Sequence, residues 1–87
     1  MPKVKFEVTT DATPYWIAVG KDDVALSNGK GSITLPPGEH RLIWWFQGDH
    51  GVTMKMVGKV GDDEVVNVTS TIPDDSFDGA GRKKFTV

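Results

Sequence analysis

The stretch from His40 to Gln47, which reads His-Arg-Leu-Ile-Trp-Trp-Phe-Gln, is the most apolar part of the chain and decides the fold. Neighbouring side chains on a strand point to opposite faces, so this stretch divides into two faces. The first carries Leu42, Trp44 and Phe46, and the second carries Arg41, Ile43 and Trp45. Because both faces hold apolar side chains, we predict a strand in the middle of a sheet. Trp44 is then expected in the core, and Trp45 is expected to face away from it.

Shorter stretches of the same kind surround this strand. Lys3 to Val8 alternates strictly between charged and apolar residues, the pattern of a strand with one solvated side. Further strands are expected within residues 15–19, 24–26, 32–35, 52–57, 65–72 and 82–87. Asn28-Gly29 is a strong signal for a hairpin turn. Residues 73–81 are expected to form the longest irregular loop.

Glycine and proline divide the chain too often for long helices. The 87 residues include 10 Gly and 5 Pro, which suits short strands joined by tight turns. Seven or eight short strands separated by frequent turns indicate a sandwich or a small barrel. We predict an all-β fold, a small antiparallel β-sandwich that forms a single domain over residues 1–87.

Composition limits the partners and the compartment. The 10 basic and 12 acidic residues give a net charge of −2, which disfavours a general nucleic-acid binder. No run is long enough to span a membrane, and the first residues lack the apolar region of a secretory signal. The chain is expected to be cytoplasmic as written or to be a domain of an exported or surface protein.

The segment from Leu35 to Leu42, Leu-Pro-Pro-Gly-Glu-His-Arg-Leu, follows a strand, a turn at Pro14 and a glycine-containing hairpin. In this order the chain resembles PEGA-type and Ig-like β-sandwich modules over about half its length. The Pro-Glu-Gly-Ala signature of PEGA repeats is missing, and Tyr15 to Gly20 replaces their usual segment of small residues. The resemblance implies a non-catalytic interaction domain and no site residues.

Residues for catalysis are scarce. The chain has no cysteine and only two histidines, His40 and His50, as bases near neutral pH. It contains no nucleophile elbow, phosphate loop or dinucleotide fingerprint. We therefore predict no catalytic residues, no enzymatic activity and no cofactor.

Two weak metal patterns are present. Asp74, Ser76 and Asp78 place oxygen ligands at alternate positions before Gly79, like half of a calcium loop. The expected reading is a solvated turn, because these residue types are also the usual loop formers. His50 with Met54 and Met56 offers soft ligands of the type that bind Cu(I), but methionine at these positions is expected to pack in the core.

The remaining feature is the set of Trp16, Trp45 and Arg41. If alternation holds, both tryptophans lie on the outer side of their strands, and Arg41 shares the face of Trp45. The alternative is that both indoles are buried under a loop or a second inner face, because a small domain needs its apolar area. Exposed Trp with Arg is typical of a protein interface.

From these residues we predict a non-catalytic protein-interaction or structural assembly module. The alternative is a carbohydrate-binding module in which the exposed tryptophans stack on sugar rings. A protein partner or self-association is expected, carbohydrate is possible, and neither nucleic acid nor a membrane span is expected.

Overall fold

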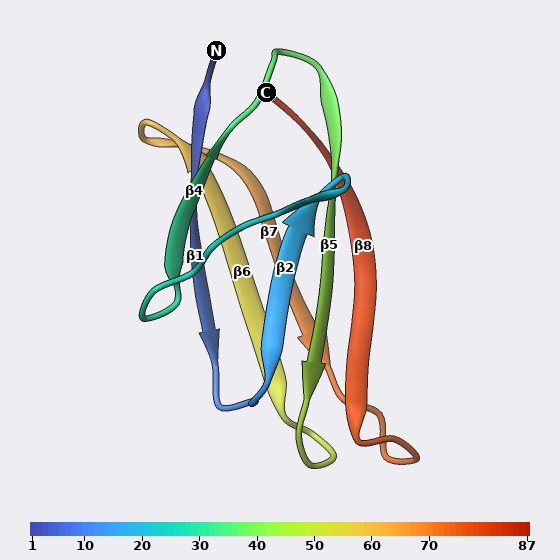
Figure 1. The fold of residues 1–87 in the computed structure, drawn as a ribbon. Helices are drawn as coiled ribbons and strands as arrows, with labels where there is room; N and C mark the ends of the chain where they lie inside the picture. Colours follow the sequence, from blue (N-terminus) through green and yellow to red (C-terminus); the bar gives the residue numbers. More distant parts are fainter.

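The fold consists of two antiparallel four-stranded sheets that pack face to face, as seen in a computed structural model that describes all residues from 1 to 87 (Figure 1). The strands are β1 (Lys3–Thr10), β2 (Tyr15–Val19), β3 (Asp22–Asp23), β4 (Lys30–Thr34), β5 (Glu39–Gln47), β6 (Thr53–Val60), β7 (Asp63–Thr71) and β8 (Asp78–Thr86). One sheet has the order β4-β1-β6-β7 and the other has the order β3-β2-β5-β8. The predicted all-β sandwich of seven or eight strands is confirmed, with eight strands. The short strand expected within residues 24–26 is wrong, because the strand there, β3, covers only Asp22–Asp23.

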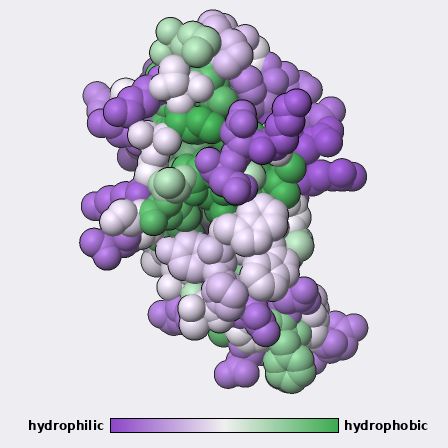
Figure 2. All heavy atoms as spheres, viewed as in Figure 1, coloured by the Kyte–Doolittle hydropathy of each residue, from purple (hydrophilic) through white to green (hydrophobic).

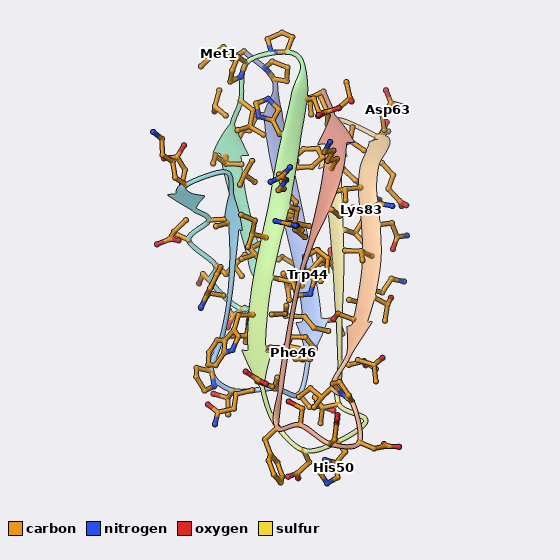
Figure 3. All side chains as sticks on the ribbon, turned by 90° about the vertical axis from the view of Figure 1, so that its right-hand side faces the viewer. Met1, Trp44, Phe46, His50, Asp63 and Lys83 are labelled. Carbon is orange, nitrogen blue, oxygen red and sulfur yellow. The ribbon has the colours of Figure 1, made fainter.

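The apolar stretch forms β5, which lies between β2 and β8. Leu42 and Phe46 are fully buried and Trp44 is 6% exposed. Trp44 and Phe46 point into the space between the sheets (Figure 3). The prediction of a central strand with Trp44 in the core is therefore confirmed.

The opposite sheet supplies the other half of the core by the same alternation. Val4, Phe6 and Val8 of β1 are buried, while the residues between them are exposed. The Phe6 ring meets Phe85 of β8 edge to face, with centroids 6.3 Å apart. Because Phe85 comes from the other sheet, this contact joins the two layers near the C-terminus.

The hairpin signal at Asn28-Gly29 is also confirmed. Asn28 has a φ of 54° and Gly29 a φ of 77°, the left-handed conformation that a type I′ turn requires at both central residues. Ser27 and Lys30 exchange two backbone hydrogen bonds of 2.8 and 3.0 Å across the turn. This turn leads into β4, which pairs with β1.

The predicted loop over residues 73–81 is too long, because β8 begins at Asp78. Gly79 and Gly81 take the inward positions of this strand. A Cβ atom on Gly79 would lie 2.5 Å from Phe46 Cε1, and one on Gly81 would lie 2.5 Å from Trp44 Cζ2. The two glycines are thus strand residues whose missing side chains make room for the large rings of β5.

Candidate functional site

The outer face of β2, β5 and β8 carries a row of apolar side chains. Trp16 on β2 lies directly opposite Trp45 on β5, and Ala80 on β8 lies on the other side of Trp45. In the next row, Ile43 lies between Ala18 and Arg82. The pairing of these strands therefore joins two tryptophans that are 29 positions apart in sequence (45 − 16).

These side chains lie outside the core. Trp16 is 44% exposed, while Trp45 and Ile43 are half-buried. Ala18 is buried but is not part of the core cluster. In the view of Figure 1, green and pale residues run down the middle of the molecule with purple residues on both sides (Figure 2). The alternative that both indoles are buried under a loop or a second inner face is wrong, because Trp16 is exposed.

The Trp45 ring is held by a short chain of hydrogen bonds at the start of β8. Its Nε1 donates to Asp78 Oδ2 at 3.2 Å, and the Ser76 hydroxyl donates to Asp78 Oδ1 at 2.7 Å. The hydrogen bond from Ser76, followed by that from Trp45, lowers the pKa of Asp78 below its ordinary value. At neutral pH the carboxylate is thus charged and accepts from both donors, which limits rotation of the indole.

The other half of the same face is basic. Arg41 lies opposite Lys84, and Arg82 lies beside Ile43. Lys84 forms an exposed ion pair with Glu39, with Nζ and Oε1 separated by 3.8 Å. Because such an exposed pair is weak, Lys84 contributes to the positive potential here together with the two arginines. The face therefore combines an aromatic end with a cationic end.

The structure brings the three predicted site residues, Trp16, Trp45 and Arg41, to one face of one sheet, but not into one cluster. Trp16 and Trp45 are neighbours, whereas Arg41 lies four positions from Trp45 along β5, with Ile43 between them. Sequence reasoning missed Ala80, because residues 73–81 were expected to form a loop. Arg82 was expected in the last strand but was not singled out as a site residue. The alternation of Asp78, Ala80, Arg82 and Lys84 is visible in the sequence once Gly79 and Gly81 are accepted as inward positions.

Most residues of the two metal patterns make other contacts, and Asp74 is exposed. Ser76 and Asp78 bond to each other, and both carboxylate oxygens of Asp78 accept hydrogen bonds from side chains. No group of three or more His, Cys, Asp or Glu residues is placed to hold a metal ion. Met54 and Met56 are completely buried in the core, as expected for packing residues.

Both histidines bond to backbone carbonyl groups and pack against phenylalanine. His40 Nε2 lies 2.7 Å from the Pro36 carbonyl oxygen, and its ring is tilted against Phe85 at 6.0 Å. His50 Nδ1 lies 3.0 Å from the Ser76 carbonyl oxygen, and its ring lies 5.0 Å from that of Phe77. Phe77 itself is 62% exposed at the tip of the loop before β8.

The outer face of the other sheet has a different character. It contains a hollow of about 650 Å³ that is lined mainly by polar residues, including Lys5, Lys30, Lys55 and Lys59. Glu7 and Glu64 lie among these lysines, and no ion pair links them within 4.0 Å. The tryptophans are thus confined to the core and to the outer face of β2 and β5.

No protein-family model, curated protein or solved structure matches this chain. The resemblance to PEGA-type and Ig-like modules therefore stays a prediction. No helix of the length and apolarity needed to cross a membrane is present.

Proposed function

We propose that this chain is a non-catalytic protein-interaction module that binds its partner on the outer face of β2, β5 and β8. The observation that carries the proposal is the position of Trp16 directly opposite Trp45 outside the core. Tryptophan and arginine are the residues most enriched at the energetic centres of protein interfaces, and this face carries both. Keeping such apolar area exposed is unfavourable in the isolated chain, and a partner that covers it would remove that cost.

The arrangement of the face indicates the chemistry of the partner. An apolar or aromatic side chain would bury itself against Trp16, Trp45 and Ala80, at one end of the face. Carboxylates of the partner would meet Arg41, Arg82 and Lys84 at the other end, where an arginine can bind a carboxylate with two parallel hydrogen bonds. The proposed partner is thus an apolar protein segment next to acidic residues.

A random-peptide display selection against the folded chain tests this proposal. We expect the enriched peptides to combine an aromatic or large aliphatic residue with Asp or Glu, and to lose binding to Trp16→Ala and to Arg82→Glu. Phe77→Ala is the matched control, because Phe77 is an exposed aromatic residue outside this face. Peptides that bind the Trp16→Ala chain as well as the wild type would contradict the proposal.

A carbohydrate ligand is the second candidate, and the fixed orientation of Trp45 favours it. Because Asp78 holds the indole Nε1, the ring is available as a preformed surface on which a sugar ring could stack. On a glycan array, this candidate predicts binding that is lost in Trp16→Ala and weakened in Asp78→Asn. Peptide binding without any glycan signal would favour the protein partner.

A further inference from the structure

The two long edge strands of the sandwich, β7 and β8, lie next to each other on one side of the molecule (Figure 3). Each has nine residues and pairs on one side only. An unpaired strand edge exposes a row of backbone N–H and C=O groups that can pair with another chain. The two edges differ in whether their side chains carry charges that hinder such pairing.

The hydrogen-bond pattern identifies the free backbone groups of β7. Ile72 N donates to Val52 O at 2.9 Å, directly beyond the end of the ladder between β6 and β7. Because bonding alternates along an antiparallel pair, the even-numbered residues 66, 68 and 70 bond to β6. The N–H and C=O groups of Asn67, Thr69 and Thr71 therefore point away from the sheet.

The side chains of β7 favour further pairing. Val65 to Thr71 reads Val-Val-Asn-Val-Thr-Ser-Thr, without a charge, glycine or proline, and five of the seven residues are β-branched. Segments of high β-propensity and low charge are those that add strands most readily. No side chain in this segment carries a charge that would hinder pairing with a second strand, and in this sense the edge is unguarded.

The edge of β8 is guarded by charge. Arg82, Lys83 and Lys84 follow one another in this strand, and all three are exposed. Lys83 lies opposite the fully buried Leu42, on the inward side of the strand, where a charge hinders another strand from pairing with β8. The other two edges belong to β3, with two residues, and β4, with five. The sandwich thus has one long unguarded edge.

We propose that two copies of this chain pair antiparallel through β7, about a two-fold axis near Thr69, to form one continuous eight-stranded sheet. In this register Thr69 lies opposite Thr69 of the second copy, and Asn67 lies opposite Thr71. Pairs of hydroxyl-bearing residues across antiparallel strands are favourable. Since each copy offers a single unguarded long edge, the pairing closes as a dimer and does not continue into a fibre. The β7 edge is separate from the face that carries Trp16 and Trp45.

Sedimentation equilibrium of the full chain over a wide range of concentrations tests the proposal. We expect a reversible dimer for the wild type. Thr69→Lys places two ammonium groups opposite each other at the axis and should raise the dissociation constant at least about tenfold. Thr86→Lys is the matched control, an exposed residue on the free edge of β8, and should leave the dimer intact. Circular dichroism of each variant establishes that the fold is retained.

Amide hydrogen exchange identifies the paired edge. The amides of Asn67, Thr69 and Thr71 should gain protection as the concentration rises, while those of Ala80, Arg82 and Lys84 should not. A wild type that stays monomeric at the highest concentration would overturn the proposal. So would a dimer that survives Thr69→Lys but is lost in Trp16→Ala, which would place self-association on the tryptophan face instead.

Discussion

The inner and outer faces of the β2-β5-β8 sheet are both rich in aromatic residues, but only the inner face is sealed. On β5, Trp44 is 6% exposed and packs over the backbone of Gly81, whereas its neighbour Trp45 is half-buried beside the exposed Trp16. Both faces contain apolar residues of the same alternating strand, so the local sequence pattern alone does not explain why one face is sealed and the other is exposed. The inner face is covered by β1 and β6 across the sandwich, and nothing in the chain covers the outer face to the same extent. The aromatic side chains of the outer face are thus not needed to fill the core.

Replacing the two neighbouring tryptophans should have opposite results, and this is the largest effect that we expect. Trp44→Ala empties an aromatic core site and should lower the free energy of unfolding by about 3–5 kcal/mol. Trp45→Ala removes a side chain from the outer face and should cost about 1 kcal/mol or less. Urea unfolding of both variants measures the difference. Equal, large losses would mean that Trp45 also belongs to the core.

The glycines of β8 test how tightly the inner face is packed. Gly81→Ala would bring a methyl group against the Trp44 ring and should destabilise the fold by about 1–3 kcal/mol, the usual cost of overpacking. The matched control is Gly48→Ala, where the nearest atoms to an added Cβ lie 3.5–3.6 Å away, at ordinary contact distance. Thermal unfolding should separate the two variants. A neutral Gly81→Ala would show that the ring can move.

Trp16 provides the counterpart on the outer face. Because it is 44% exposed and lies outside the core cluster, Trp16→Ala should change the free energy of unfolding by only about 0.5 kcal/mol. Acrylamide quenching of fluorescence should fall clearly in this variant, since Trp16 is the most exposed of the three indoles. A loss of stability comparable to that of Trp44→Ala would contradict the division into two faces.

Acid should release the Trp45 ring before the protein unfolds. The pKa of Asp78 is lowered in the folded chain, so its hydrogen bonds are complete at neutral pH and are lost as the pH falls through that lowered pKa. We expect a small change in tryptophan fluorescence at acid pH in the wild type. Asp78→Asn should lack this step, and Asp75→Asn in the same loop should retain it. A step that persists in Asp78→Asn would have to come from another group.

Features that depend on neighbouring residues in the sequence could be predicted, whereas features that depend on the pairing of distant strands could not. The alternation in β5 was sufficient to separate Trp44 from Trp45, and Met54 and Met56 were correctly placed in the core. The start of β8 was missed because Gly79 and Gly81 leave no side chains with which to recognise a strand. The position of Trp16 beside Trp45 depends on the pairing of distant strands. No local sequence pattern predicts the register between β2 and β5.

The outer face of β2, β5 and β8 is the proposed partner-binding surface. The most direct test of this claim is an NMR titration of the labelled chain with the strongest peptide from the display selection. We predict that the shifted signals cluster at the indole N–H groups of Trp16 and Trp45 and at the amides of Ala80 and Arg82. Shifts confined to the lysine-lined hollow of the opposite sheet or to β7, with the two indoles unchanged, would contradict the claim.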